Sequence, residues 1–246
     1  MLSLQAISKT FASGLSSRKA AIHDLSFTVP EKTVLGFLGP NGAGKSTTIK
    51  MVMDFIRPDK GDIRIFGQSH RESVSRKRVG FLPEHPYYYD NLTARELLDF
   101  LGKAAGIPAS LIRSRGDALL DRLQLVDAAD KLLRSYSKGM QQRAGFAAAL
   151  LHDPDLLILD EPLSGLDPIG RHMIITLLME LKQQGKTIFF SSHILNDIER
   201  LCDSVAILNQ GRLLFHDSLA VCTGNGATTL ESAFVSMITQ DDSTCQ

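Results

Sequence analysis

The sequence contains few cysteines, and they form no recognisable pattern. Its three cysteines, Cys202, Cys222 and Cys245, are odd in number, and no two of them form a Cys-x-x-Cys pair. This distribution argues against a disulfide framework and against a structural zinc site. It is typical of a protein that stays in a reducing cytosol.

The sequence also lacks an excess of charge and a long hydrophobic run. Lys and Arg number 27, as do Asp and Glu, whereas nucleic-acid-binding proteins normally have a basic excess. No run approaches the roughly 18 apolar residues of a membrane span. The first residues, Met1–Gln5, lack the regions of a signal peptide. We therefore expect an intracellular chain with no nucleic-acid partner.

The most specific motif is a glycine-rich segment that reads G-x-x-x-x-G-K-S-T and follows the apolar run Thr33–Leu38. A buried strand, a glycine-rich turn and a helix that begins near Lys45 are the context of a phosphate-binding P-loop. The N–H groups of such a turn face one anion, and the positive end of the helix dipole adds to the attraction. The motif predicts nucleoside triphosphate binding by Gly39, Pro40, Asn41, Gly42, Ala43, Gly44, Lys45, Ser46 and Thr47.

A second candidate site follows another apolar run. Leu156–Leu159 is continuously hydrophobic, as in a fully buried parallel strand, and Asp160 and Glu161 come directly after it. Together with the P-loop, this arrangement predicts that Asp160 and the Ser46 hydroxyl hold Mg²⁺, and that Glu161 polarises an attacking water. Lys45 is expected to reach the β- and γ-phosphates. An acidic pair at a strand end that stood alone would just as often be a solvated turn.

Hydrophobic periodicity predicts the remaining elements. Apolar residues alternate with polar ones over residues 2–6 and 25–29, which indicates half-buried antiparallel strands, and the polar segment 13–19 between them reads as an exposed loop. Apolar strands at residues 156–159 and 187–190, with a helix at residues 168–184 and Gly185 between them, predict a parallel α/β sheet, which binds its ligand at the carboxyl ends of its strands. The turn at residues 209–211 between the apolar segments 205–208 and 213–215 predicts a hairpin.

The middle of the chain has a helical pattern. A capping box at Thr93–Glu96 precedes apolar residues at helical spacing. We expect an inserted helical subdomain at residues 87–151, within a catalytic core of residues 1–86 and 152–222. A linker, one short helix and a polar tail are expected at residues 223–246.

Five motifs in this order resemble the ATPase subunit of an ABC transporter over nearly the whole chain. They are Gly39–Thr47, Ser137–Arg143, Asp160–Pro162, Ser164–Pro168 and Ser191–His193. The resemblance implies a P-loop NTPase of the α/β class, with a RecA-like parallel sheet, an N-terminal antiparallel β subdomain and an inserted α-helical subdomain. It further implies an ATPase whose cofactors are ATP and Mg²⁺.

The resemblance also implies roles for residues that pattern alone does not identify. Phe11 corresponds to an aromatic residue that stacks on adenine. Ser137 and Gly139 correspond to the signature motif, which contacts the γ-phosphate bound by the partner subunit of a dimer. Asp167 corresponds to a carboxylate between the two sites, and His193 to the histidine that contacts the γ-phosphate and orients the water.

The sequence departs from the family pattern at two positions. Lys138 stands in the signature where glycine is common, and adds charge and a side chain at a point of close approach. Glu84 stands where the family has a metal-sensing glutamine. A carboxylate still ligates Mg²⁺ directly or through water but cannot donate a hydrogen bond as an amide does, so we expect retained metal sensing with altered coupling.

The resemblance implies partners outside this sequence. These are a transmembrane permease in a separate chain and a second ATPase subunit, in a homodimer or a heterodimer, so that the chain would be cytoplasmic and peripheral to the inner face of the cell membrane. Tyr87, Tyr88 and Tyr89 either pack on their own subdomain or form an exposed aromatic patch in the region that faces the permease. The Glu84 and Lys138 departures and the short tail look most like exporter-type ATPases.

Two alternatives belong to other functional classes. A soluble ABC-type ATPase of translation or DNA repair usually carries two cassettes or a very long coiled-coil insert, and neither feature occurs in this sequence. A nucleotide switch or scaffold that does not hydrolyse ATP would have no need of Glu161 and His193, although an inactive site can retain its motifs.

Overall fold

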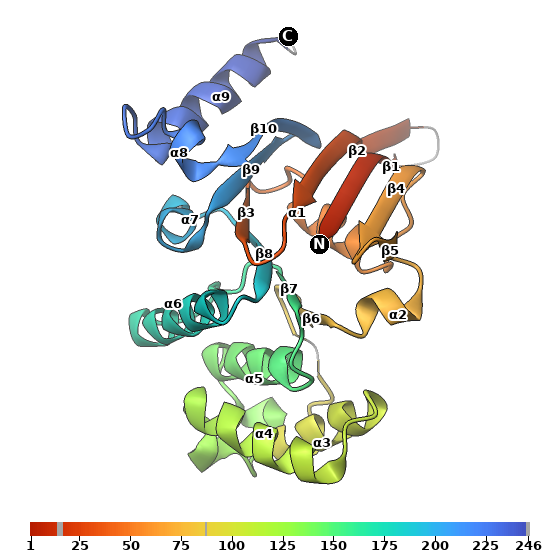
Figure 1. The fold of residues 1–246 in the computed structure, drawn as a ribbon, viewed down its shortest axis with the longest axis vertical. Coiled ribbons are helices and arrows are strands. Elements are labelled where there is room, and N and C mark those ends of the chain that lie inside the picture. Colours follow the sequence, from red (N-terminus) through yellow and green to blue (C-terminus); the bar gives the residue numbers. More distant parts are fainter. Residues whose placement is uncertain (14–16, 87, 245–246) are drawn as a thin grey trace. The chain divides into compact units, whose positions relative to one another are not determined.

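The computed structural model describes residues 1–13, 17–86 and 88–244, and its chain divides into two units (Figure 1). The first unit combines Met1–Arg76 with Lys182–Gln246, and the second comprises Lys77–Leu181. Among the described residues, no helix has the length and hydrophobicity needed to cross a bilayer.

An antiparallel sheet opens the first unit. Its strands, in the order β2-β1-β4-β5, are β1 (Leu2–Ser13), β2 (Ser17–Val29), β4 (Lys60–Ile65) and β5 (Gln68–Ser69). Leu2 pairs with Val29 and with Ile65, and all three side chains are buried, so the predicted alternation marks the inner face of this sheet. The loop predicted at residues 13–19 is shorter than expected, because β1 includes Ser13 and β2 begins at Ser17; residues 14–16 lie outside the described residues.

The first unit also contains the strand that leads into the P-loop. Four strands are ordered β10-β9-β3-β8, namely β3 (Val34–Leu38), β8 (Thr187–Ser192), β9 (Ser204–Asn209) and β10 (Arg212–Ser218). β3 runs parallel to both β8 and β9, and β10 returns antiparallel to β9 as the predicted hairpin. The residues of β3 and β8 are all buried, which accounts for the hydrophobic runs Val34–Leu38 and Ile188–Phe190.

The helices among the described residues of the first unit are α1 (Lys45–Val52), α2 (Ser73–Arg76), α7 (Leu195–Leu201), α8 (Leu219–Cys222) and α9 (Leu230–Thr244). Phe27, Phe37 and Phe189 pack together in the core with ring centroids 5.4–5.7 Å apart. The prediction of a short C-terminal helix with a polar tail was wrong, because α9 continues to Thr244. Its last turns make hydrogen bonds with the β9–β10 turn that the sequence pattern does not reveal.

The second unit contains two parallel strands and most of the long helices. β6 (Val79–Leu82) pairs with β7 (Leu156–Leu159). The helices are α3 (Ala94–Ala104), α4 (Ala109–Arg122), α5 (Lys138–Leu150) and α6 (Pro168–Gln183), whose last residues belong to the first unit. The predicted capping box at the start of α3 is confirmed, since Thr93 and Glu96 each accept a hydrogen bond from the other's backbone N–H.

Candidate functional site

The predicted phosphate-binding loop lies between β3 and α1 in the first unit. Gly42 and Gly44 have φ values of +81° and +109°, which glycine adopts without steric cost. A Cβ added at Gly44 would lie 2.6 Å from Cδ1 of Ile22 and 3.0 Å from the carbonyl oxygen of Ala21, whereas one at Gly42 would meet no atom within 4 Å. The space beside Gly42 therefore allows a ligand to approach the backbone closely.

The first turn of α1 provides positive charge at this loop. Gly44, the residue before the helix, has no side chain to cap it, as in helices whose first N–H groups bind an anion. The Lys45 side chain is only 6% exposed, and its Nζ donates to the carbonyl oxygens of Gly39 at 2.7 Å and Pro40 at 3.3 Å. A cation held across the loop in this way would bind phosphate oxygens by charge-assisted hydrogen bonds.

His193 lies at the same edge of the sheet as the start of the P-loop. β8 and β3 are parallel, with Ser192 opposite Leu38, so His193 and Gly39 follow two paired residues. The His193 side chain is exposed, although β8 before it is buried. The sheet thus brings together two predicted site residues that are far apart in the sequence.

Phe11 lies on β1, in the antiparallel sheet of the first unit. Its ring is 39% exposed, and Nζ of Lys9 lies 5.6 Å from the ring centroid. An aromatic ring that is accessible and has a cation on one face can stack on a base.

The predicted acidic residues lie at the carboxyl ends of β6 and β7 in the second unit. Leu82 pairs with Leu159, and the N–H of Asp160 donates to the Leu82 carbonyl oxygen at 2.8 Å. Asp160 and Glu161 are 4% and 8% exposed, and Glu161 has a φ of +47°. Left-handed backbone at a non-glycine residue also occurs at turns elsewhere in this chain, and at a functional site it serves to aim a side chain. Glu84 follows the neighbouring strand end, so this edge brings it near Asp160.

The donor set expected for the metal is chemically suited to Mg²⁺. Within the ranges that the structure describes, no group of three or more His, Cys, Asp or Glu side chains could hold a metal ion. Mg²⁺ in phosphoryl-transfer sites normally takes one or two carboxylates, a hydroxyl, waters and substrate phosphates. Ser46 of the first unit provides a hydroxyl, and Asp160 and Glu84 of the second unit provide carboxylates, which are the donor types of such sites.

The signature residues begin α5. Ser137 is the N-cap residue, and its Oγ accepts a hydrogen bond from the N–H of Met140 at 3.2 Å. A Cβ added at Gly165 would lie 2.8 Å from Cε of Lys138, so the extra side chain at position 138 packs against the segment that follows Glu161. Gly139 faces the same segment, since its Cβ would lie 3.7 Å from the Gly165 carbonyl oxygen.

Asp167 stabilises the start of α6. Its Oδ1 accepts from the N–H of Gly170 at 2.9 Å, and its carbonyl oxygen accepts from the N–H of Arg171 at 2.8 Å. This is the geometry of a helix N-cap. The exposed carboxylate therefore has a local structural function whether or not it also contacts a partner subunit.

The sequence placed Gln142 and Arg143 in the signature segment without a role, and the structure shows that both support the signature helix. Gln142 is buried, and its Nε2 donates to the Pro162 carbonyl oxygen at 3.1 Å, which ties α5 to the residue after Glu161. Arg143 donates from Nη1 to the carbonyl oxygens of Leu123 at 2.8 Å and Gln124 at 3.1 Å. The signal in the sequence was the presence of two polar side chains directly before the small, apolar remainder of the helix.

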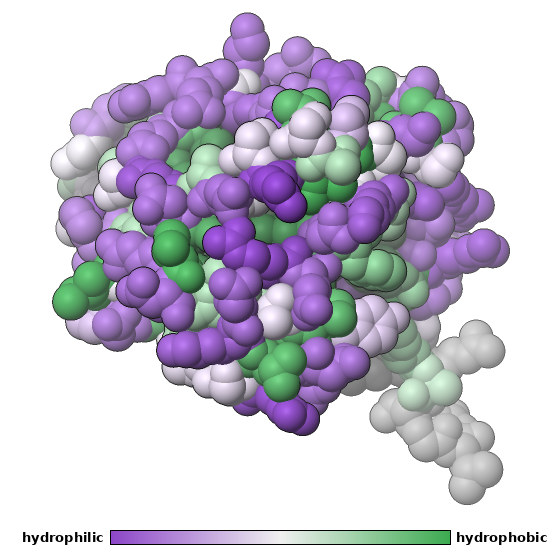
Figure 2. Space-filling model, turned by 90° about the horizontal axis from the view of Figure 1, so that it is seen from below, coloured by the Kyte–Doolittle hydropathy of each residue, from purple (hydrophilic) through white to green (hydrophobic). Residues whose placement is uncertain are grey.

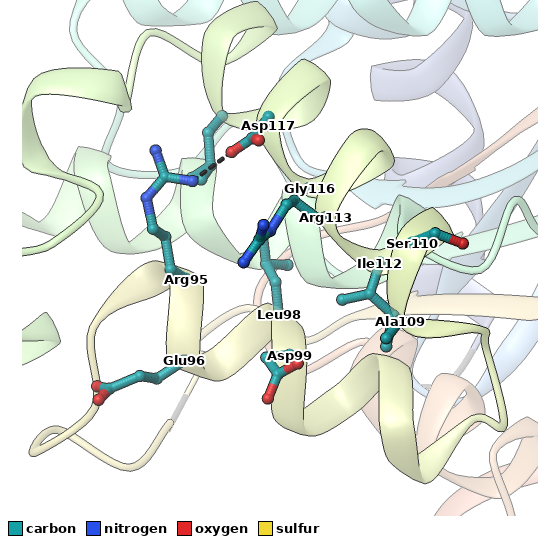
Figure 3. Close-up of a pocket in the computed structure, with 11 residues that line it drawn as sticks. Arg95, Glu96, Leu98, Asp99, Ala109, Ser110, Ile112, Arg113, Gly116 and Asp117 are labelled. Atoms are coloured by element: carbon teal, nitrogen blue, oxygen red, sulfur yellow. Dashed lines mark hydrogen bonds and ion pairs between the residues drawn. The ribbon is translucent and has the colours of Figure 1, made fainter.

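The hollows formed by described residues of the second unit include two of similar size. One, of about 570 Å³, is lined by Glu84, His85, Pro86, Tyr88, Asp90, Leu133, Lys138, Gln141 and Gln142. The other, of about 500 Å³, lies between α3 and α4, with Leu98 and Ile112 on its floor and the Arg95–Asp117 ion pair beside it (Figure 3). Both departures from the family pattern, Glu84 and Lys138, thus line the same hollow.

The tyrosines predicted as a cluster have different environments. Burial raises the pKa of Tyr88 to about 12, and a Cβ at Gly145 of α5 would lie 3.4 Å from its hydroxyl oxygen. Tyr89 is largely exposed and makes an edge-to-face contact with Phe100, with ring centroids 6.1 Å apart. Tyr87 lies outside the described residues. Tyr88 therefore packs on the helical region, and Tyr89 belongs to an exposed aromatic pair.

Comparison with known proteins identifies the family. The family model described as ABC transporter matches residues 22–164. An uncharacterized ABC transporter ATP-binding protein of Synechocystis is 44% identical over 89% of this chain and 63% of its own length. The Nod factor export ATP-binding protein I of Ralstonia nicotianae is 37% identical over 86% of this chain and 65% of its own length. The chain thus spans less than two thirds of the length of these curated relatives.

A solved structure confirms the fold class. The ATP binding subunit of an ABC transporter superposes with a TM-score of 0.86 at 32% identity, covering 96% of this chain and 98% of that chain. The predicted P-loop NTPase fold of the α/β class, with its additional antiparallel sheet, is therefore confirmed.

Proposed function

Since this chain belongs to the ABC transporter family, we propose that it is the ATP-hydrolysing subunit of an exporter, and that two such subunits enclose two ATP·Mg. The observation that supports this most directly is the P-loop, where a buried lysine, two left-handed glycines and a helix start converge on one turn. This arrangement suits a phosphate, because the N–H groups of a glycine-rich turn, the start of a helix and a cation all attract an anion.

Within this site we propose that Lys45 and the backbone of Gly39–Thr47 hold the β- and γ-phosphates. Ser46, Asp160 and Glu84 would hold Mg²⁺, which neutralises the phosphate charge that develops during transfer. Glu161 would accept the proton of the attacking water, and His193 would orient that water against the γ-phosphate. Burial of Glu161 supports this role, since a base that is shielded from bulk water holds one water in line.

Four further residues would act outside the phosphate-binding loop of this chain. We propose that Phe11 stacks on adenine, which agrees with its accessible ring. Ser137, Gly139 and Asp167 would meet the nucleotide of a partner subunit, in a homodimer or heterodimer. The Ser137 hydroxyl and the first turn of α5 suit a phosphate oxygen, since a helix N-terminus attracts an anion.

The membrane partner is proposed to be a permease in a separate chain, so that this chain is peripheral to the cytoplasmic face of the membrane. Residues 87–151 would form the helical subdomain that transmits motion to the permease. The face in Figure 2 is mostly hydrophilic, with hydrophobic side chains in small separate groups. The exposed Tyr89–Phe100 pair offers such a partner an aromatic anchor. The export function of the Ralstonia relative supports the direction of transport.

The test compares wild type with Glu161→Gln in Mg²⁺-dependent ATP hydrolysis, with the oligomeric state recorded across ATP concentrations. The matched control is Glu199→Gln, which makes the same change at an exposed position of α7. We expect wild type and the control to turn over, and Glu161→Gln to bind ATP, lose hydrolysis by roughly 10³-fold and accumulate as a dimer. Hydrolysis by Glu161→Gln at the wild-type rate would contradict the assignment, and absence of ATP binding by wild type would contradict the proposed function itself.

A further inference from the structure

The turn between β9 and β10 is hydrogen-bonded to both the P-loop and β2. The N–H of Gly211 donates to the carbonyl oxygen of Ala43 at 2.8 Å, and the carbonyl oxygen of Gly211 accepts from the N–H of His23 at 2.8 Å. Gly211 has a φ of +78°, and a Cβ there would lie 2.3 Å from the Ala21 carbonyl oxygen. The turn is therefore wedged between β2 and the P-loop, with no space for a side chain.

Leu208, the residue of β9 that precedes Asn209, lies against both Gly39 and Gly44 of the same loop. A Cβ added at Gly39 would lie 2.4 Å from the Leu208 carbonyl oxygen, and one at Gly44 would lie 3.4 Å from Leu208 Cδ2. The segment 208–211 thus touches the P-loop at its first residue, at Ala43 and at the residue before α1. A shift of this segment would change the direction of the P-loop N–H groups.

The C-terminal helix α9 holds this segment in place. Asn209 is buried, and its Nδ2 donates to Oδ2 of Asp241 at 2.9 Å and to Oδ1 of Asp242 at 3.1 Å. Nε2 of Gln210 donates to the same Oδ1 of Asp242 at 3.0 Å. Hydrogen bonds to a carboxylate are stronger than those between neutral groups. The two carboxylates therefore fix both amide side chains of the turn, and α9 also packs against α7, α8 and β9 (Figure 1).

We propose that Asp241 and Asp242 are positioning residues for the nucleotide site. They act through Asn209 and Gln210 on Gly211, whose N–H holds the Ala43 carbonyl and so aims the P-loop at the phosphates. This inference rests on the proposed function and adds a residue pair to it that lies outside the five motifs. Since the contact lies wholly within the first unit, α9 and the P-loop respond to each other without a partner subunit.

The experiment compares ATP affinity and backbone hydrogen exchange in wild type and in the double variant Asp241→Ala/Asp242→Ala. We expect the dissociation constant for ATP to rise about fivefold, and the amide of Gly211 and those of residues 41–45 to exchange faster without nucleotide. The matched control is Glu231→Ala, which removes a carboxylate from the exposed first turn of the same helix. It should leave both readouts unchanged. Asp242→Asn, which keeps an acceptor oxygen, should recover part of the lost affinity relative to Asp242→Ala.

A purely structural role of α9 gives a different result. In that case the double variant would have a lower melting temperature, while its ATP affinity and the exchange of residues 41–45 stayed at the wild-type values, and the proposal would be overturned. If the double variant does not fold, Gln210→Ala removes one bond of the same contact at an exposed position, with the same two readouts. Failure of wild type to bind ATP would refute the proposed function, which separates that outcome from failure of this inference.

Discussion

The helices α1 and α5 both begin at a residue that the sequence links to phosphate, but their first turns are built differently. α1 begins after Gly44, which has a left-handed backbone and offers no side-chain cap. α5 begins after Ser137, which has an extended backbone and whose hydroxyl oxygen accepts a hydrogen bond from the N–H of Met140. A helix start without a side-chain cap relies on water or a ligand for its N–H groups, whereas a side-chain cap satisfies one of these groups within the chain.

This difference indicates which helix depends more on the nucleotide. The P-loop carries a buried ammonium group and two left-handed glycines, which together favour a bound polyanion. At α5, the Ser137 hydroxyl already accepts one hydrogen bond and can still donate its own proton to a phosphate oxygen. The proposed phosphate contact would therefore satisfy uncapped N–H groups at α1, whereas at α5 it would add to a cap that is already formed.

Removal of the Lys45 charge should have the largest effect of the changes considered for this comparison. We expect Lys45→Met to lower the rate of ATP hydrolysis by roughly 10²–10³-fold, because a charged donor at the reacting phosphate is lost. Lys50→Met, at an exposed position in the last turn of the same helix, is the control and should retain activity. Equal loss of hydrolysis in both variants would show that the charge of α1, and not the position of Lys45, matters.

Alanine substitutions at the two P-loop glycines should affect different properties, namely stability at Gly44 and ATP binding at Gly42. Gly44→Ala should reduce the free energy of unfolding by about 2–5 kcal/mol, since its Cβ would meet Ile22 and Ala21 in addition to the backbone strain. Gly42→Ala should cost only about 1–2 kcal/mol from backbone strain. It should weaken ATP binding, because its Cβ fills open space beside the loop. Chemical denaturation and ATP titration distinguish the two variants, and equal unfolding free energies would contradict the expected difference between these glycines.

Loss of the cap on α5 should have a smaller effect on stability. Ser137→Ala should lower the free energy of unfolding by about 1 kcal/mol, and Thr93→Ala, which removes the cap of α3, should cost a similar amount. Only Ser137→Ala is expected to reduce ATP hydrolysis as well. If both variants hydrolysed ATP at the wild-type rate, the Ser137 hydroxyl would have only its structural role.

The smallest effect is expected from His70, which lies beside the residues that follow α1. It should appear in the pH dependence of the free energy of unfolding. Asp54 follows this helix, and Oδ1 of Asp54 lies 3.9 Å from Nε2 of the buried His70. Burial lowers the pKa of His70 below its ordinary value of 6.5. The unfolded chain therefore binds a proton at His70 more readily than the folded chain does. The stability that is present above pH 6.5 is lost as the pH falls from 6.5 through the lower pKa of the folded state.

Thermal or denaturant unfolding at several pH values tests this expectation. The loss of stability below neutral pH should be smaller in His70→Asn than in wild type, because the titrating group is removed. His172→Asn, at an exposed position of α6, serves as the control and should retain the wild-type pH dependence. An unchanged pH dependence in His70→Asn would indicate that other groups control the acid sensitivity.

Local sequence determined much of this protein. The hydrophobic runs at β3, β7 and β8, the capping box at Thr93 and the left-handed Gly185 after α6 all follow from residue type and spacing, and the structure has them where they were predicted. The P-loop and the acidic pair were recognisable because phosphate and metal chemistry require these residue types at the ends of buried strands.

Tertiary structure alone decided the features that depend on residues far apart in the chain. The length of α9 could not be predicted, because Asp241 and Asp242 read as a polar tail until their bonds to Asn209 are known. The neighbouring positions of His193 and Gly39, and the separate environments of Tyr88 and Tyr89, likewise follow from strand pairing and burial. Periodicity describes only which face of an element is apolar, whereas hydrogen bonds between distant segments form only once the chain has folded.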